Sequence, residues 1–478
     1  MSRYYIDPFG CVKNQVDAEN LMAYLNSAGW ECAADAGSSD LIIVNSCGFI
    51  ESAKQESIDA VLQWRGLYPG KKILLAGCLA QRYMKELPEI LTEADAFFGV
   101  KNPAEIIKKV NSIFPAPDKE HESSSIILNS VADSKTSINS YHLLPGERPL
   151  LSLPGSAYVK ISEGCDNRCS YCAIPLIRGG LVSRDISAIV EECRSLLARG
   201  VKELCVIGQD IGAFGADKHS GETNQGLPGL LGAISSLKGD FWVRLLYIHP
   251  DHFQPEILDL MEKDTRFLPY FDIPFQHASP KILAAMNRCR SQESPAEKYL
   301  ALINTIRARL PDAVIRSTFL LGFPGETEED FAMLLDFQEK ANLDWLGCFL
   351  YSREENTKSY LMKKRIPAKT ASSRKKIIEE RQIPITEKNM RRFTGRDMDV
   401  LLEEKIGSDA ANTGEANESF WLGRSFCQAP DIDGATVIVC DNESGKNLRA
   451  GEFIKCRITA RRGFDLEAVK KTAACQVN

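Results

Sequence analysis

The stretch EGCDNRCSYCAIP, residues 163–175, places Cys165, Cys169 and Cys172 in the spacing CxxxCxxC. It directly follows an apolar run, 157–161, that is typical of a buried strand. The three cysteines, which we call the second cysteine set, therefore fall on a loop at the carboxyl end of a strand. Parallel α/β folds place their chemistry at such strand ends.

Strand and helix patterns alternate on the C-terminal side of this loop. Apolar strands are predicted at 203–207, 242–248, 270–275, 314–321 and 346–351. Helical patterns lie between most of them, for example at 186–198 and 327–341. Six strand–helix units are too few for a closed eight-stranded barrel. We therefore predict an α/β protein whose central domain, 151–390, is an open partial (β/α)6 barrel.

The first 115 residues show the same alternation, which indicates a second parallel α/β domain. Strands are predicted at 3–6, 41–45 and 72–76, with helices at 15–27 and 52–64. One cysteine follows each predicted strand, and these form the first cysteine set: Cys11, Cys47 and Cys78. Parallel strands bring such ends to one edge of a sheet. Buried cysteine is common, however, so spacing alone leaves core packing open as the alternative.

Two further segments differ in character. Residues 116–150 are rich in Ser and Pro and are predicted to form a linker. Short β-type runs at 399–403, 436–440 and 453–460 are broken by Gly, Asn and Asp. They predict a small all-β barrel over 391–466, followed by a C-terminal tail, 467–478.

Composition excludes several classes of protein. The net charge of −6 is a poor basis for non-specific nucleic-acid binding, and no apolar run approaches the ~20 residues of a membrane span. We see no export signal at the N-terminus, so the 15 cysteines are expected to be reduced thiols of a cytoplasmic protein. No P-loop, HExxH or GxSxG motif is present.

Three thiolates in the CxxxCxxC spacing suit a metal cluster that keeps one position open. Iron–sulfur clusters normally take four cysteines, so a three-cysteine loop leaves one iron for another ligand. The alternatives are a structural zinc site that lacks its fourth ligand and a chance occurrence of the spacing.

The motifs resemble those of a known family. EGCDNRCSYCAIP resembles the signature of the radical S-adenosylmethionine superfamily, with Tyr171 at its usual aromatic position. FGCVKNQVDAEN, NSCGFIESAKQESID and AGCLAQRY resemble the N-terminal domain of the methylthiotransferases, and the C-terminal module resembles the TRAM domain. The resemblance implies an enzyme with a 4Fe–4S cluster on each cysteine set. It also implies S-adenosylmethionine as radical source and methyl donor, and an electron donor such as flavodoxin or ferredoxin.

Residues outside the cysteine sets are less specific. The superfamily resemblance suggests that Tyr171, Gln209, Gly322 and Gly325 contact S-adenosylmethionine. GFPGET, residues 322–327, also fits a turn that caps the next helix. Gln209 also fits a solvated loop, and His277 is more often structural than catalytic.

The substrate is predicted from charge and from motif detail. Residues 391–466 hold 11 Lys and Arg against 13 Asp and Glu, a net charge of 11 − 13 = −2. A transfer-RNA binder should be basic there, whereas an acidic module suits a basic protein. GRSFCQAPDIDG resembles the branch that modifies an aspartate of small-subunit ribosomal protein S-twelve (uS-twelve), which makes Asp431 and Asp433 candidate substrate contacts. PLIRG departs from that branch, which more often has Ser-Met before Arg178.

Two other functions stay open from the sequence. One is methylthiolation of an isopentenyl- or threonylcarbamoyl-adenosine in transfer RNA, which would use the same six cysteines. The other is a non-catalytic, iron-sensing RNA-binding scaffold, which needs no S-adenosylmethionine.

Overall fold

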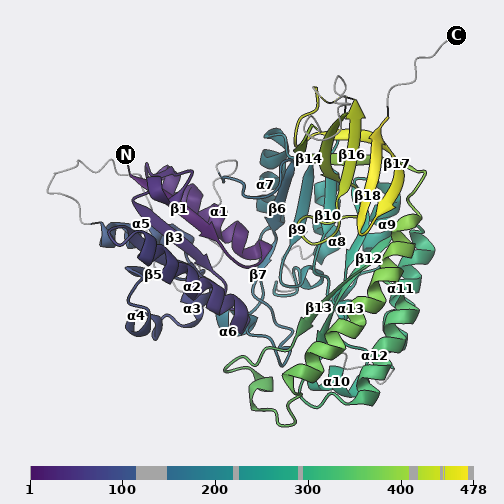
Figure 1. The fold of residues 1–478 in the computed structure, drawn as a ribbon, viewed down its shortest axis with the longest axis horizontal. Coiled ribbons are helices and arrows are strands. Elements are labelled where there is room, and N and C mark those ends of the chain that lie inside the picture. The colour runs from purple at the N-terminus through teal and green to yellow at the C-terminus, as the bar shows by residue number, and fades with distance from the viewer. Residues whose placement is uncertain are drawn as a thin grey trace. The chain divides into compact units, whose positions relative to one another are not determined.

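The computed structural model describes residues 2–114, 148–218, 226–288, 294–408, 418–441, 445 and 447–471 (Figure 1). The chain forms two compact units. Unit 1 comprises 1–151, 160–192 and 352–361, and unit 2 comprises 152–159, 193–351 and 362–478. The predicted linker, 116–150, lies outside the described residues except for 148–150.

The N-terminal domain is a parallel five-stranded sheet in the order β2-β1-β3-β4-β5, which confirms the predicted parallel α/β fold. Its strands are β1 (Arg3–Pro8), β2 (Glu31–Cys32), β3 (Leu41–Ser46), β4 (Lys72–Gly77) and β5 (Ala96–Phe98). Its helices are α1 (Val12–Ser27), α2 (Glu51–Leu67), α3 (Cys78–Arg82), α4 (Leu87–Ile90) and α5 (Ile106–Ile113). Strands β2 and β5 are too short to leave a pattern that we could read in the sequence.

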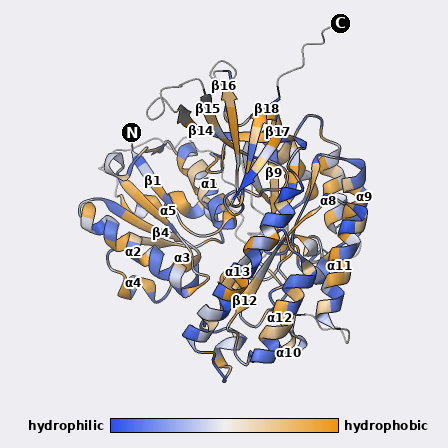
Figure 2. Cartoon of the chain, turned by 45° about the vertical axis from the view of Figure 1, so that its right-hand side comes forward, coloured by the Kyte–Doolittle hydropathy of each residue, from blue (hydrophilic) through white to orange (hydrophobic). Residues whose placement is uncertain are grey.

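Both faces of this sheet are covered, which explains why the sequence of β3 is apolar without alternation. Leu41 and Ile43 pack in a core with residues of α1 and α5. Ile42 and Val44 pack in the opposite core with residues of α2. In Figure 2 the strands of the sheet are largely hydrophobic (orange), whereas the covering helices show both hydrophobic (orange) and hydrophilic (blue) residues.

The central domain contains the predicted six strands in one open sheet, ordered β13-β12-β11-β10-β9-β6. The strands are β6 (Ser156–Lys160), β9 (Glu203–Ile207), β10 (Trp242–Leu245), β11 (Phe267–Asp272), β12 (Val314–Leu321) and β13 (Trp345–Leu350). Those from β9 to β13 pair in parallel. The helices are α7 (Ile186–Ala198), α8 (Gly226–Ser235), α9 (Glu256–Lys263), α10 (Pro280–Ala285), α11 (Pro295–Arg309), α12 (Glu328–Ala341) and α13 (Ala368–Arg391).

The cysteine loop follows β6 and is flanked by two short elements. A two-stranded ribbon joins β7 (Ser162–Glu163) to β8 (Val182–Ser183), and α6 (Ile174–Ile177) lies between them in the sequence. Among the described residues, no helix is both long enough and apolar enough to span a membrane.

The C-terminal module is a closed five-stranded barrel, as predicted. Its strands are β14 (Asp397–Ser408), β15 (Glu418–Arg424), β16 (Thr436–Asp441), β17 (Phe453–Arg462) and β18 (Asp465–Lys470). The expected boundary at 466 falls inside β18. This strand closes the barrel by pairing with both β16 and β17, so the barrel extends into the predicted tail.

Candidate iron–sulfur and S-adenosylmethionine site

The first cysteine set lies at one edge of the N-terminal sheet. Cys11 precedes α1 after β1, Cys47 follows β3, and Cys78 begins α3 after β4. These three strands are neighbours, and the order 2-1-3-4-5 changes direction between β1 and β3. Parallel sheets of this order bind ligands at the carboxyl ends of the strands at that switch point.

Close packing brings these strand ends together. The Asn14 amide donates to the carbonyls of Phe9 (2.6 Å), Asn45 (3.2 Å) and Ser46 (3.2 Å), so α1 fastens the ends of β1 and β3. A Cβ atom on Gly10 would lie 3.0 Å from the Cβ of Cys47. The loop that holds Cys11 therefore touches the loop that holds Cys47.

The three thiols differ in exposure. Cys11 is exposed, Cys47 is intermediate and Cys78 is buried. Burial raises the pKa of the Cys78 thiol to about 12, and the Arg178 guanidinium acts in the opposite direction. Burial also raises the pKa of Cys47. Cys78 is therefore the most deeply buried of the three thiols.

The second cysteine set lies on a compact loop. The Cys172 amide donates to the carbonyl of Cys169 (3.1 Å), and the Cys165 amide donates to the carbonyl of Gly179 (3.2 Å). Gly164 has φ +68°, and a Cβ there would lie 1.9 Å from the carbonyl oxygen of Gly180. Only glycine allows the loop to close in this way. Tyr171 lies within the loop and is partly buried.

Both cysteine sets belong to unit 1. Cys78 packs with Ala173 and Ile177, which directly follow the second set, and with Val100. The sequence separates the sets by almost 90 residues, so only the folded chain shows this proximity.

A closed ring of four buried charges joins the same segments. Arg178 pairs with Asp17 (2.7 Å) and with Glu163 (2.7 Å). Lys160 pairs with Glu163 (2.7 Å) and with Asp17. We call these four residues the charge ring. Reasoning from sequence missed it, although charged residues in the apolar run AYVKISEG were a usable signal.

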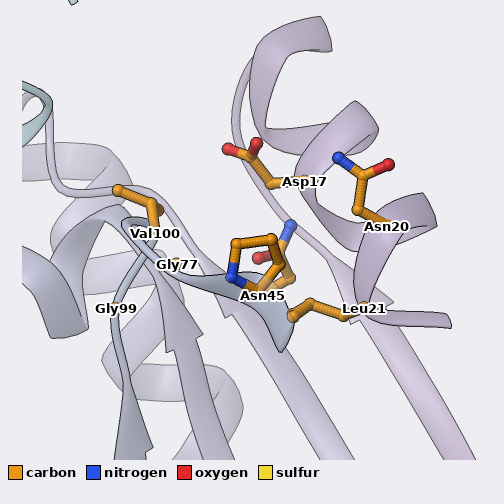
Figure 3. Close-up of a pocket in the computed structure, with 8 residues that line it drawn as sticks. Asp17, Asn20, Leu21, Asn45, Gly77, Gly99 and Val100 are labelled. Carbon is orange, nitrogen blue, oxygen red and sulfur yellow. The ribbon is translucent and has the colours of Figure 1, made fainter. Parts of the chain in front are cut away.

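A small pocket opens beside Asp17 at this edge of the sheet (Figure 3). Asn20 and Asn45 also line it, and both are buried. The amide of Asn20 and the Oδ1 atom of Asn45 have no hydrogen-bond partner among the described residues. The pocket therefore has polar atoms without partners on both α1 and β3, and it is about the size of one water molecule.

The donors that each cysteine set offers are three thiols, the ligand type of iron–sulfur clusters. Among the described residues, no three Cys, His, Asp or Glu side chains gather as ligands of one ion. In a cluster each thiolate binds a different iron, so the sulfurs need to surround a larger group. The strand ends of the N-terminal sheet and the loop after β6 each supply three such thiols.

The candidate S-adenosylmethionine contacts of unit 2 lie at strand ends. Gln209 follows β9, and Gly322 follows β12. The Gly322 amide donates to Glu326 (2.8 Å), and Gly325 donates to the carbonyl of Lys364 (2.9 Å). The two glycines therefore shape the turn before α12.

GFPGET also caps that helix. The Thr327 hydroxyl accepts from the amide of Asp330 (3.3 Å), and the Asp330 carboxylate accepts from the amide of Thr327 (2.8 Å). The turn-and-cap alternative thus has direct support, while cofactor contact stays a prediction. His277 is fully buried and accepts at Nδ1 from the amides of Ala278 and Ser279 (both 3.0 Å). Burial lowers its pKa to about 3, which indicates a neutral structural residue.

The two aspartates of APDIDG differ. Asp431 is exposed and accepts from the Tyr158 hydroxyl (3.3 Å). The Asp433 side chain is 1% exposed and accepts from the Tyr270 hydroxyl (2.6 Å) and the Ala429 amide (2.8 Å). This burial argues against direct substrate contact by Asp433 and leaves Asp431 as the candidate.

The partial barrel and its cysteine loop define a radical S-adenosylmethionine protein. The model of the Radical SAM superfamily matches residues 159–337, that of Uncharacterized protein family UPF0004 matches 3–99, and that of the TRAM domain matches 394–470. The fold resembles a radical S-adenosylmethionine methyltransferase, TsrM, from Kitasatospora setae, solved with cobalamin and a [4Fe-4S] cluster bound. The TM-score is 0.54 at 16% identity, over 75% of this chain and 77% of that one.

Relatives in three bacteria define the family more narrowly. Each is named ribosomal protein uS12 methylthiotransferase RimO. The protein of Treponema denticola is 44% identical over 97% of this chain and 100% of its own length. Those of Carboxydothermus hydrogenoformans and Thermotoga maritima are 38% and 36% identical, over 97% of this chain and 98% and 99% of their own lengths. The chain belongs to the RimO family of methylthiotransferases.

Proposed function

We propose that this protein inserts a methylthio group at the β-carbon of an aspartate of ribosomal protein uS12. Family membership supports the reaction, and the observation that carries it is the placement of both cysteine sets in one compact unit. The relatives from Treponema denticola, Carboxydothermus hydrogenoformans and Thermotoga maritima are all named for uS12 and not for transfer RNA. We place the reaction in the cytoplasm.

The six cysteines would hold two 4Fe–4S clusters, one on each set. When bound, these clusters and S-adenosylmethionine would supply removal of a hydrogen atom from an unactivated carbon and delivery of sulfur and methyl in its place. A flavodoxin or ferredoxin would supply electrons. Tyr171, Gln209, Gly322 and Gly325 are the proposed S-adenosylmethionine contacts.

The chain's own residues prepare the site. Gly164 lets the second cysteine set close against Gly180. Ala173 and Ile177 cover Cys78 and keep water from that thiol. Asp431, on the exposed side of its loop, is the proposed contact for a basic substrate.

Iron content and product mass test the proposal. We expect about 8 iron per chain after anaerobic reconstitution, from two clusters. With S-adenosylmethionine, a reductant and sulfide as the sulfur source, uS12 should gain the mass of one methylthio group in place of a hydrogen atom. Transfer RNA in a parallel reaction should not change. Modified transfer RNA with unmodified uS12 would overturn the substrate assignment.

Two variants separate the cysteine sets. Cys169→Ala should abolish reductive cleavage of S-adenosylmethionine. Cys47→Ala should retain cleavage and lose the thiomethylated product. Thiomethylated product from the Cys47 variant would contradict a sulfur-presenting role for the first cysteine set. About four iron per chain in the unmodified protein would mean that it holds one cluster and not two.

A further inference from the structure

Arg178 is directed at a cysteine sulfur by its buried partners. Its side chain is 1% exposed, and its Nη2 atom lies 3.0 Å from the Sγ of Cys78. The same Nη2 lies 2.7 Å from Asp17, and Nη1 lies 2.7 Å from Glu163. Carboxylates from two different segments thus fix both arms of the guanidinium. Charge-assisted pairs of this kind restrict geometry as well as adding energy.

The position of Arg178 in the chain connects the two cysteine sets. It directly follows α6, which begins two residues after Cys172. The residue that contacts a sulfur of the first set is therefore carried by the segment that continues from the second set. The packing of Ala173 and Ile177 on Cys78 holds the same segment in place.

We propose that Arg178 is a positioning residue that raises the reduction potential of the cluster held by the first cysteine set. This inference rests on the proposed function. An N–H donor and a positive charge beside a thiolate favour the more negative, reduced state of its cluster. The effect is strongest where water is excluded, as it is at the buried Cys78.

A purely structural role is the competing explanation, since the charge ring also holds α1 to the cysteine loop. Arg82 provides a matched control for it. This arginine lies on α3 with Cys78, its side chain is 5% exposed, and it pairs with the buried Glu354 (2.6 Å). It donates to the carbonyl of Gly48 (2.9 Å) beside the first set, and not to a sulfur. Loss of Arg82 removes a buried charge from the same region without removing an N–H···S contact.

The test uses the full chain with Cys165, Cys169 and Cys172 replaced by Ala, which should retain only the first cluster. Arg178→Gln, Arg178→Lys and Arg82→Gln are added separately. The readouts are iron per chain and the reduction potential from an anaerobic titration followed by electron paramagnetic resonance. We expect the potential to become more negative in R178Q and to be intermediate in R178K. In R82Q it should stay close to that of the parent.

Each outcome has one meaning. Absence of a cluster in the parent triple variant would count against the proposed function. A loaded R178Q with the parent's potential would overturn the tuning role, as would an equal shift in R82Q. If R178Q takes up no iron, the tuning role is tested by the reduction potential of the cluster in R178K, which should be more negative than that of the parent. Loss of iron from both Arg178 variants, with R82Q loaded, would also overturn the tuning role and leave Arg178 as a structural residue.

Discussion

Gly164 shows how one residue controls the cysteine loop. Its positive φ is disfavoured for other residues, and its missing side chain admits the Gly180 carbonyl. Gly179 also has a positive φ, +82°, but a Cβ there would meet nothing within 4 Å. An alanine at either position would cause backbone strain, and an alanine at Gly164 would also cause a steric clash.

We expect Gly164→Ala to lower both stability and iron uptake. The strain alone costs about 1–3 kcal/mol, and the clash with Gly180 adds to it. Gly179→Ala, the control, should show only the strain. Thermal unfolding midpoints and iron content after reconstitution check this. Equal behaviour of the two variants would mean that the loop shifts to accept the methyl group.

The buried carboxyl group of Asp433 should make the stability of the protein depend on pH. Burial raises its pKa to about 6 from 3.8, against the opposing influence of Arg316 and Tyr270. The folded state therefore binds this proton more tightly than the unfolded state. Stability from this group is highest below pH 4 and falls as the pH rises from about 4 to 6. The loss is about 1–3 kcal/mol, from about 1.4 kcal/mol per pKa unit.

Asp433→Asn keeps the shape of the side chain and removes the titration. Urea unfolding of both full-length proteins at pH 4.5 and pH 7 gives their free energies of unfolding. The difference, wild type minus variant, should be more negative at pH 7. A difference that does not change with pH would contradict the raised pKa.

At the scale of elements, Glu203 joins the partial barrel to the β barrel within unit 2. It lies on β9 and pairs with Arg244 of β10 (2.7 Å) and Arg424 of β15 (2.6 Å). All three side chains are almost fully buried. The two arginines outweigh the effect of burial and hold the pKa of Glu203 at about 2.

We expect Glu203→Gln to destabilise unit 2 by about 3–5 kcal/mol, because it leaves two buried guanidinium groups without their carboxylate. Asp312→Ala is the control, since it breaks an exposed pair with Arg396 (2.6 Å) and should cost about 1 kcal/mol or less. Urea unfolding compares them. Similar losses of unfolding free energy in the two variants would show that the buried Glu203 pairs contribute no more to stability than an exposed ion pair does.

At the scale of the whole molecule, charge should guide substrate binding. The chain carries −6 and its proposed substrate is basic, so association with uS12 should slow as salt screens the attraction over ~10 Å at 0.1 M. Asp431→Asn should weaken binding by about 0.2–1 kcal/mol. Asp59→Asn, an exposed change on α2, is the charge-matched control. An equal loss of binding in the two variants would show that Asp431 does not contact uS12 directly.

The fold class and the position of the six cysteines after strands could be predicted from the order of residues along the chain. Apolar strands alternating with helices produce parallel sheets, and a cysteine just after a strand must lie at a sheet edge. These are local consequences of the order of residues along the chain. Short strands such as β2 and β5 escaped prediction because their pairing partners, not their own patterns, make them strands.

The contacts between residues far apart in the sequence could be seen only in the folded chain. APDIDG presented two equivalent aspartates, and folding buried Asp433 against Tyr270 while Asp431 stayed exposed. Arg178 appeared in the sequence as a detail of PLIRG, and folding placed it against Cys78, 100 residues away. Contacts across such separations depend on the packing of several elements at once, and no local pattern encodes them.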